Sequence, residues 1–358
     1  MPQRHREQKL PGGSRTVTFA FCRLPFVLCL AFSLCLCGAA LRKGSPLDAL
    51  PPHIEQLTWF GERADFSPDN KRVAFMAKSF GDAFEIDLAA RHIRCLTCSI
   101  PGAAFLRVQY LVNGDYLING PERFKDLRAS RRSESELWIL RKDGTLPLLR
   151  LNQRLSEGAA VSKKALRIAW SNTEGQYPDE VPKGHTRLYV ADIDYSGGAP
   201  RLANKKMVLE SNDPYCRIEA QDFYDNDTKL TYTCYRPGDK AEVMGLDLKT
   251  GQTTNFSQSP KTYNEVEGVF PDGQHTCVEA DRQGNGDGSH HVDIWKLKLD
   301  GAGKNFERVT YFTDYEGFKA SNPVVSTDGK MMAFQVAMTK DEAGVGYGIL
   351  LYHFDRKK

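Results

Sequence analysis

The sequence predicts an all-β fold, a six-bladed β-propeller whose ring is closed by an outer strand near the N-terminus. Three observations support this prediction. A short turn motif recurs along the chain, an amphipathic strand follows each copy, and a strand-ending phrase occurs before the first turn but is missing after the last strand. Four strands repeated about every 45 residues are typical of a propeller blade.

The turn motif is clearest at residues 64–75, where an apolar run enters Ser-Pro-Asp-Asn-Lys and a β-rich run leaves it. Pro68 presets the backbone for the first central turn position, and Asp69 and Asn70 tolerate the positions after it. Two strands joined by such a turn form a hairpin. Related turns lie at 112–115, 162–164, 225–229, 270–273 and 326–330. Six turns predict six blades.

An amphipathic strand follows the turns, and several blades then end in Leu-Thr or Val-Thr. The amphipathic strands lie at 84–88, 136–140, 188–192, 243–247 and 293–297. The ending phrase occurs at 92–97 and 305–310, and also at 53–58, ahead of the first turn. We therefore predict that residues 53–58 supply the outer strand of the last blade, which leaves no open sheet edge at the seam.

Two resemblances follow from these motifs. Residues 67–75 and 326–330 resemble the Ser-Pro-Asp-Gly-Lys repeats of TolB-like six-bladed propellers, and this likeness covers nearly all of residues 53–354. It implies the fold and says little about function, because propellers host many activities. Four shorter segments are similar to secreted fungal saponin hydrolases, which remove the sugar part of triterpene glycosides: 61–66, 78–84, 219–223 and 264–268. This second resemblance implies a secreted glycoside hydrolase.

The N-terminal part reads as a leader. Residues 1–23 are basic, and residues 24–40 are apolar and end in small residues. We predict a secretory signal within residues 1–43, cut near Ala39–Ala40, with an uncleaved signal anchor as the alternative. Residues 44–358 then form one propeller, and we expect an extracellular protein.

The composition restricts the partners. The net charge of +3 includes the basic leader, and no basic stripe with interleaved aromatic residues occurs. Nucleic acid is therefore not expected as a partner. We predict a monomer that binds a small-molecule glycoside or a glycan, with no cofactor, no metal and no stable membrane association unless the leader is retained.

The cysteines and sequons also fit export. Cys216 and Cys234 flank one turn almost symmetrically, which favours a disulfide in an oxidising compartment. Cys95 and Cys98 are interpreted as a local disulfide or strand-end thiols, since no second pair with zinc spacing exists. The odd count leaves a thiol, which we expect to be buried. Two sequons, at Asn226 and Asn255, would be glycosylation sites in a eukaryotic host.

Candidate site residues come from the channel. The innermost strands of a propeller converge on the axis, so the segments just before the turns line one mouth. Counting back five or six positions from each turn gives Glu62–Arg63, Leu106–Arg107, Glu157–Gly158, Ala220–Gln221, Glu265–Val266 and Ser321–Asn322. Glu219, Asp222 and Glu267 lie within a residue of this register. A solvated channel lined with ion pairs, as in non-enzymatic propellers, would give the same pattern.

Glycosidic cleavage needs a carboxylic acid and a second carboxylate as nucleophile or base. Glu265 and Glu267 share one face of a strand because they are two residues apart, and Glu219 on the preceding blade is the preferred partner. We predict these three as catalytic. Arg63 and Arg107 would bind an acidic group such as a uronic acid carboxylate. The other predicted substrate-binding residues are Gln221, Asp222, Glu157 and Asn322.

Two other functions stay open. A non-catalytic extracellular propeller that binds a protein or glycan predicts an occluded channel, every carboxylate paired and an apolar rim. A metal-assisted polysaccharide lyase requires at least three His or carboxylate ligands in the channel. The loop bearing Asp287, His290, His291 and Asp293 could supply such ligands, but we interpret it as solvated. Trp59 could be a sugar platform, although we favour core packing.

Overall fold

The computed structural model describes residues 41–283, 286–341 and 344–356. Nearly all of the predicted leader, residues 1–43, lies outside the described residues, so its identity as a signal peptide or anchor stays a prediction. Within the part of the chain that is described, no helix is both long and apolar enough to cross a membrane.

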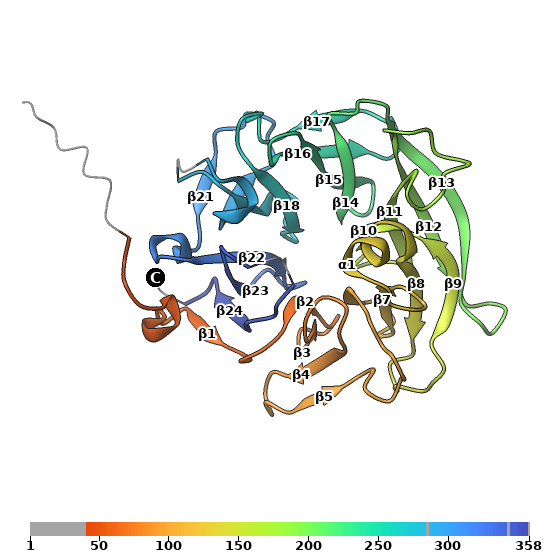
Figure 1. The fold of residues 1–358 in the computed structure, drawn as a ribbon, viewed down its shortest axis with the longest axis horizontal. Coiled ribbons are helices and arrows are strands. Elements are labelled where there is room, and N and C mark those ends of the chain that lie inside the picture. The colour runs from red at the N-terminus through yellow and green to blue at the C-terminus, as the bar shows by residue number, and fades with distance from the viewer. Residues whose placement is uncertain (1–40, 284–285, 342–343, 357–358) are drawn as a thin grey trace, which may run out of the picture. The chain divides into compact units, whose positions relative to one another are not determined.

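Residues 41–358 form six four-stranded antiparallel sheets arranged in a ring, as Figure 1 shows. This confirms the predicted six-bladed propeller. Each blade is given below from its innermost to its outermost strand. Blade 1 contains β2 (Glu62–Phe66), β3 (Arg72–Met76), β4 (Ala83–Asp87) and β5 (Ile93–Cys95); blade 2 contains β6 (Arg107–Tyr110), β7 (Tyr116–Gly120), β8 (Glu136–Leu140) and β9 (Leu149–Arg154).

Blades 3 to 6 follow the same order. Blade 3 contains β10 (Ser156–Val161), β11 (Arg167–Thr173), β12 (Thr186–Asp194) and β13 (Arg201–Ser211); blade 4 contains β14 (Arg217–Tyr224), β15 (Lys229–Arg236), β16 (Lys240–Asp247) and β17 (Thr253–Asn255). Blade 5 contains β18 (Asn264–Val269), β19 (His275–Ala280), β20 (Asp293–Lys298) and β21 (Phe306–Arg308); blade 6 contains β22 (Phe318–Val325), β23 (Met331–Met338), β24 (Ile349–His353) and β1 (Ile54–Gln56).

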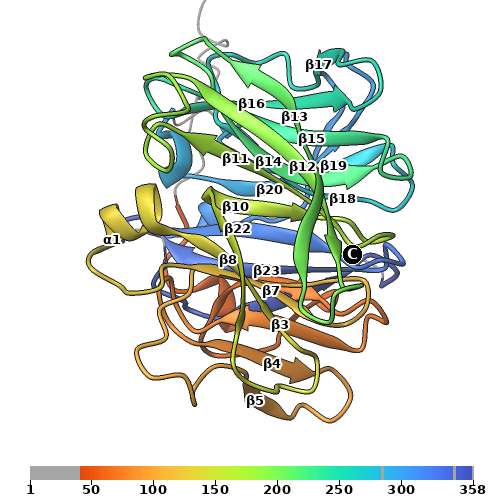
Figure 2. The same ribbon diagram turned by 90° about the vertical axis from the view of Figure 1, so that its right-hand side faces the viewer.

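The helical segments are short and lie in the connections. They are η1 (Pro46–Ala49), α1 (Leu127–Ala129), the π-helical turn η2 (Ser130–Glu134), η3 (Gly288–His290) and η4 (Phe312–Asp314). The pair α1–η2 stands out from the end of the ring where the innermost strands begin (Figure 2).

The seam closes as predicted. β1 pairs antiparallel with β24 in the register Ile54–Tyr352, so the N-terminal strand is the outermost strand of blade 6. The Leu-Thr phrase has a structural reason, because the threonine hydroxyl accepts a hydrogen bond from the start of the neighbouring strand. Thr58 accepts from the amide of Ile349 at 3.0 Å, and Thr97 accepts from the amide of Ala83 at 3.0 Å.

The turn copies are alike in detail. The Ser67 hydroxyl accepts from the Arg72 amide at 2.9 Å, and the Ser326 hydroxyl accepts from the Met331 amide at 2.9 Å. Asn70 has a φ of 56°, a left-handed conformation that asparagine tolerates. Its side-chain amide donates to the Thr327 hydroxyl at 2.8 Å. The first and last copies of the turn are thus bonded to each other across the seam.

Apolar side chains fill the space between and within the blades. Trp170, for example, is fully buried in a cluster with Leu155 and Ile139. The expectation that Trp59 packs into the core is wrong, because its exposed fraction is 81 %. The neighbouring Phe60 is the aromatic residue that packs there, against Phe75 and Phe84.

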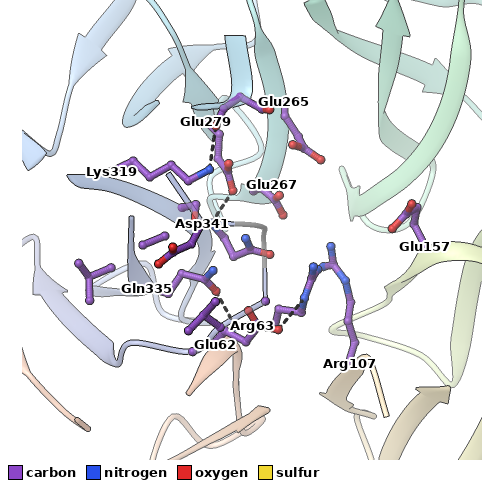
Figure 3. Close-up of a pocket in the computed structure, with 18 of the residues that line it drawn as sticks. Glu62, Arg63, Arg107, Glu157, Glu265, Glu267, Glu279, Lys319, Gln335 and Asp341 are labelled. Atoms are coloured by element: carbon purple, nitrogen blue, oxygen red, sulfur yellow. Dashed lines mark hydrogen bonds and ion pairs between the residues drawn. The ribbon is translucent and has the colours of Figure 1, made fainter. Parts of the chain in front are cut away.

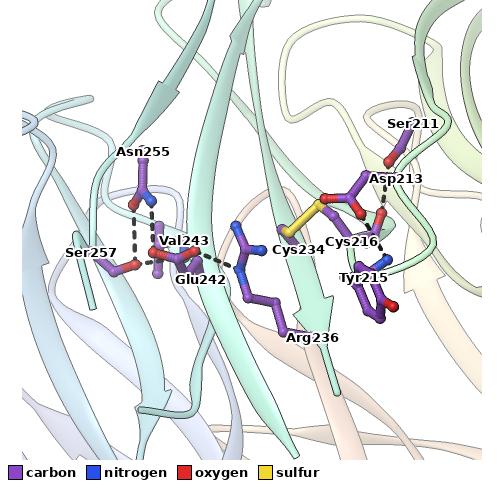
Figure 4. Close-up of a disulfide and its surroundings, with 10 residues drawn as sticks. All are labelled: Ser211, Asp213, Tyr215, Cys216, Cys234, Arg236, Glu242, Val243, Asn255 and Ser257. Carbon is purple, nitrogen blue, oxygen red and sulfur yellow. Dashed lines mark hydrogen bonds and ion pairs between the residues drawn. A yellow bond between two sulfur atoms is a disulfide. The ribbon is translucent and has the colours of Figure 1, made fainter. Parts of the chain in front are cut away.

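Both predicted cysteine pairs are disulfides, Cys95–Cys98 and Cys216–Cys234, the latter drawn in Figure 4. Cys277 is a free thiol and is buried, as expected. The Cys216–Cys234 bond joins the two innermost strands of blade 4 beside the start of β14.

Candidate active site

Bulges in the innermost strands point side chains at the channel. The pairing register shifts within β2, β10, β14, β18 and β22, whereas β6 pairs regularly. Arg63, Glu157 and Asn322 lie in these bulges with φ values of 52°, 64° and 50°. Left-handed backbone is costly for residues other than glycine and is concentrated at functional sites, and bulges re-aim side chains. The counted positions of blades 1, 3, 4 and 6 therefore include an irregular residue, whereas Arg107 and Glu265 lie in regularly paired segments.

A cavity of about 360 Å³ opens between these strands (Figure 3). Seven of the nine predicted site residues line it: Arg63, Arg107, Glu157, Glu219, Glu265, Glu267 and Asn322. Gln221 and Asp222 instead line an adjoining hollow of about 60 Å³, which shares Arg63, Arg107, Glu267 and Asn322 with the main cavity. The predicted catalytic glutamates are therefore together, and two predicted binding residues lie further along the channel.

Several residues that line this cavity were not among the predicted site residues. The most important are Arg131, Arg217, Tyr235, Tyr263, Glu279 and Lys319. Arg131 belongs to η2, in the connection between β7 and β8, and no repeat spacing relates that segment to the axis. Glu279 lies directly opposite Glu265 in the β18–β19 pair, so a predicted hairpin register would have found it.

Three carboxylates gather on blade 5. One oxygen from each of Glu265, Glu267 and Glu279 lies within 4.8 Å of the others. Burial, together with the charges of Glu265 and Glu279, raises the pKa of Glu267 well above its usual value. Burial and the charge of Glu265 raise the pKa of Glu279 to about 7. Like charges this close cannot all ionise at low cost, so at least one of these carboxyls is protonated near neutral pH.

Two tyrosines hold Glu265. The Tyr263 hydroxyl donates to one oxygen of Glu265, and the Tyr235 hydroxyl donates to the other. The Tyr235 hydroxyl also lies 3.0 Å from an oxygen of Glu219. A phenol carries one hydrogen, so it cannot donate fully to both carboxylates. Burial and the charge of Glu157 raise the pKa of Glu219 to about 7.

The arginines differ in how far they are already paired. Arg63 Nε lies 3.3 Å from Glu62, and Arg131 is paired with Glu157. Burial alone would raise the pKa of Glu157, but the charge and hydrogen bond of Arg131 outweigh it and lower that pKa.

Arg107 differs from these two arginines. Among the described residues it forms no ion pair within 4.0 Å, and its Nε has no hydrogen-bond partner. Its side chain passes over Gly158, where an added Cβ would lie 2.9 Å from Arg107 Nε. Arg107 therefore keeps a guanidinium free to meet a ligand.

The lining is acidic overall. It contains eight carboxyl groups and five cationic side chains, an excess of three negative charges if all were ionised. Three of these carboxyls, Glu219, Glu267 and Glu279, have raised pKa values. Three retained protons would therefore neutralise the cavity. Oxygen ligands also suit hard cations such as Ca²⁺, and Glu265, Glu267 and Glu279 could hold one in place of protons.

The histidine loop does not form such a site with its described residues. Asp293 is fully buried and accepts hydrogen bonds from Thr310 at 2.7 Å and from the Phe312 amide at 2.9 Å. His290 is exposed. The interpretation of this loop as solvated holds at Asp287 and His290, whereas Asp293 is buried at the first position of β20.

No family model and no curated protein matches the chain. Among solved structures, a gluconolactonase from Xanthomonas campestris superposes with a TM-score of 0.53 at 11% identity, covering 84% of this chain and 89% of that one. TolB from Acinetobacter baumannii matches with a TM-score of 0.45 and 14% identity over 82% of this chain and 67% of that one. Oligogalacturonate lyase from Vibrio parahaemolyticus matches with a TM-score of 0.45 and 9% identity over 84% of this chain and 93% of that one. At these identities the likeness concerns the propeller fold alone, and both enzymatic and binding roles are compatible with it.

Proposed function

We propose that the protein is a glycoside hydrolase that uses two glutamates, Glu267 as the acid and Glu265 as the nucleophile, with saponin-type glycosides as the substrate class. The observation that carries the proposal is a carboxyl with a raised pKa beside a carboxylate held by two hydroxyl donors, in an open cavity. Environments that separate two carboxyls in this way assign their acid and base roles.

The distances favour a retaining mechanism. One oxygen of Glu265 and one oxygen of Glu267 lie within 4.8 Å of each other, and retaining enzymes hold their carboxyl groups about 5–5.5 Å apart. Glu267 would donate its proton to the leaving glycosidic oxygen while a Glu265 oxygen bonds to the anomeric carbon. The ionised Glu267 would then take a proton from water as that water displaces Glu265. Tyr235 and Tyr263 keep Glu265 oriented, and Glu219 exchanges protons through Tyr235.

The sugar would contact the arginines unequally. Arg63 and Arg131 are already paired with Glu62 and Glu157, so an acidic group on the sugar would meet Arg107 first. Asn322 and Glu157 border the same cavity and would contact hydroxyl groups. Gln221 and Asp222 would be reached through the smaller hollow alone.

The binding-module alternative fits less well. It requires an occluded channel and every carboxylate paired with a cation. The cavity instead holds about 360 Å³, and Glu267 has no hydrogen bond or ion pair with any described residue. Leaving a buried carboxyl unpaired is costly for stability and is typical of reactive sites.

A panel of plant saponins and aryl glycosides tests the proposal. The full chain is expected to release sugar, and Glu265→Gln and Glu267→Gln are expected to abolish release with the fold intact by circular dichroism. Glu55→Gln is the matched control, because Glu55 lies on β1 of blade 6, does not line the cavity, and pairs with His353 of blade 6 and Arg91 of blade 1. Proton NMR of the first product should show retention. No release from any glycoside, or release unaffected in both variants, would contradict the proposal.

A metal-assisted lyase is the second candidate, because Glu265, Glu267 and Glu279 lie close enough to share a cation. The same panel, extended to acidic polysaccharides, separates the two. A hydrolase keeps its activity in EDTA and gives saturated sugars. A lyase loses activity in EDTA, regains it with added Ca²⁺ or Mn²⁺, and gives unsaturated products that absorb in the ultraviolet.

A further inference from the structure

The two sequons occupy very different surroundings. We propose that Asn226 is an N-glycan acceptor in the mature protein, whereas Asn255 is a structural residue that carries no glycan. This inference does not rest on the proposed hydrolase activity, because neither residue lines the candidate cavity.

Asn226 is presented to solvent by a turn. It lies between β14 and β15, in a run of three left-handed residues, Asp225, Asn226 and Asp227, with φ values of 52°, 55° and 60°. Asn226 and Thr228 are both exposed. The Asn226 Oδ1 accepts from Lys164, and its Nδ2, the atom that receives a glycan, has no partner among the described residues. Asn226 Nδ2 is therefore accessible, and the exposed Thr228 hydroxyl donates only within the turn, to the Asp225 carbonyl at 2.6 Å.

The turn itself is firmly held. The Ser162 hydroxyl donates to Asp227 at 2.6 Å, the Thr228 amide donates to the Asp225 carbonyl at 3.2 Å, and Lys229 pairs with Asp225 at 2.9 Å. A sugar on Asn226 Nδ2 would break none of these bonds. The acceptor is therefore compatible with the folded ring.

Asn255 has every polar atom in use. Its Nδ2 donates to Glu242 at 2.7 Å and its Oδ1 accepts from the Gln258 amide at 2.9 Å (Figure 4 shows the Glu242 bond). The hydroxyl of Ser257, the third sequon residue, is fully buried and accepts from the Val243 amide at 3.1 Å. Glu242 is itself paired with Arg236 at 2.7 Å. The side chains of this sequon therefore hydrogen-bond β17 and the residues after it to β16.

The different surroundings of the two asparagines determine whether a glycosylated chain can fold. A glycan is added to a chain that is still folding, so both asparagines meet the transferase. A sugar on Asn255 Nδ2 would occupy the space beside Glu242, whose carboxylate is 2 % exposed, and would disturb a buried charge pair. Chains modified there would fold poorly, while chains modified at Asn226 would fold normally.

Asn226 lies away from the candidate active site. It borders a hollow of about 470 Å³ formed by the hairpin turns of blades 3 to 6, at the end of the channel away from the candidate active site. The glycan would cover the turn end and leave the cavity open. Enzymatic removal of the glycan should therefore leave the protein's ligand binding unchanged.

The test is glycopeptide mapping of the full chain expressed in yeast and purified from the secreted and the cell-retained fractions. Peptide N-glycosidase in heavy-oxygen water converts each modified asparagine into labelled aspartate, which mass spectrometry locates. We expect label at Asn226 and none at Asn255 in the secreted protein. Asn226→Gln and Thr228→Ala should each remove the single glycan, and Asn255→Gln should retain it.

Every other pattern overturns the proposal. Label at Asn255 in folded, secreted protein would show that the Glu242 contact tolerates a sugar. Absence of label at both residues would show that Asn226 is not an acceptor, whether because the chain is not exported or because the turn is not recognised. The thermal midpoint of Asn226→Gln serves as the control for folding, and it should equal that of the unmodified chain.

Discussion

The two ends of the channel use charged residues in opposite ways. At the turn end, Lys163 Nζ lies 2.8 Å from Asp65, whose other oxygen accepts from the Tyr110 amide at 2.7 Å. Asp222 accepts from the Val269 amide at 2.9 Å. These bonds join blade 1 to blades 2 and 3, and blade 4 to blade 5. At the other end, Glu267 has no partner among the described residues, and acidic groups outnumber basic ones.

The same innermost strands therefore supply residues for stability and residues for reactivity. On β2, Arg63 lines the main cavity and Asp65 bonds to neighbouring blades at the turn end. On β14, Glu219 lines the main cavity and Asp222 bonds to blade 5 at the turn end. In β2, Arg63 lies within the bulge and Asp65 after it; in β14, Glu219 lies before the bulge and Asp222 after it. In both strands the residue after the bulge forms the bonds to neighbouring blades.

The largest expected effect is on reactivity. Glu267→Gln should lower the rate of sugar release by about 10²–10⁴-fold, because it removes the proposed general acid. Its free energy of unfolding at pH 7 should not fall, because the variant removes a buried group that is costly to ionise. Steady-state kinetics and urea titration measure the two quantities. If Glu267→Gln lowered both the stability and the activity, Glu267 would serve stability as the turn-end residues do, and the proposed difference between the two ends would be wrong.

Lys163→Met is the reverse experiment. It should lower the free energy of unfolding by about 3 kcal/mol, because Asp65 and Asp222 would stay buried without their shared cation. Sugar release per folded molecule should change little, since Lys163 does not line the main cavity. Lys164→Met is the matched control, because its partner Asn226 is neutral and exposed. Equal destabilisation by both variants would show that the Lys163–Asp65 ion pair does not stabilise the contact between blades.

The pH dependence of stability should reveal buried carboxyls at both ends of the channel. The pKa values of Glu219 and Glu279 are raised to about 7 in the folded state, mainly by burial. The folded protein therefore binds more protons than the unfolded chain between pH ~4.5 and pH ~7, and its stability falls as the pH rises through that window. Glu219→Gln with Glu279→Gln should flatten this slope.

Thermal midpoints at pH 4.5 to 8 measure that slope. Burial also raises the pKa of Asp222 to about 7, so Asp222→Asn is the comparison variant at the turn end. A midpoint that increases with pH across the window would contradict the assignment of retained protons to the cavity.

The smallest expected effect concerns Gly158. In Gly158→Ala the new Cβ would come within 2.9 Å of Arg107 Nε, so the guanidinium must move by a few tenths of an ångström. We expect KM for an acidic glycoside to rise several-fold with a thermal midpoint close to that of the parent. Gly197→Ala is the control, since an added Cβ there meets no atom within 4 Å. An unchanged KM would remove Arg107 from the substrate site.

Repetition explains how much the sequence predicts. The turns at Ser67, Ser162 and Ser326 set the phase of their own blades, and counting back from them reaches Arg63, Glu157 and Asn322, the residues that the structure places in bulges. Repeat spacing cannot reach Arg131, because the connection that carries it interrupts the repeat.

Two further features of the site cannot be predicted from repeat spacing. Tyr235 and Tyr263 act through hydroxyl contacts with Glu265 that depend on side-chain direction rather than on strand position. Gln221 and Asp222 belong to the strand that was predicted, but the bulge after Ala220 sends them to the smaller hollow. Strand register can be counted from a repeat, whereas a local irregularity within a strand cannot.

The closed seam has a consequence for how the molecule assembles. His353 Nε2 lies 3.1 Å from Glu55 Oε1, a contact between residues 298 positions apart. Joining such distant segments costs about 5 kcal/mol of chain entropy, which only the completed ring recovers. β1 must therefore wait until β24 has been synthesised, and until the two strands pair, each presents an unpaired edge to other chains. Unlike an open array of repeats, whose units can fold one after another, this ring should fold and unfold as one cooperative unit.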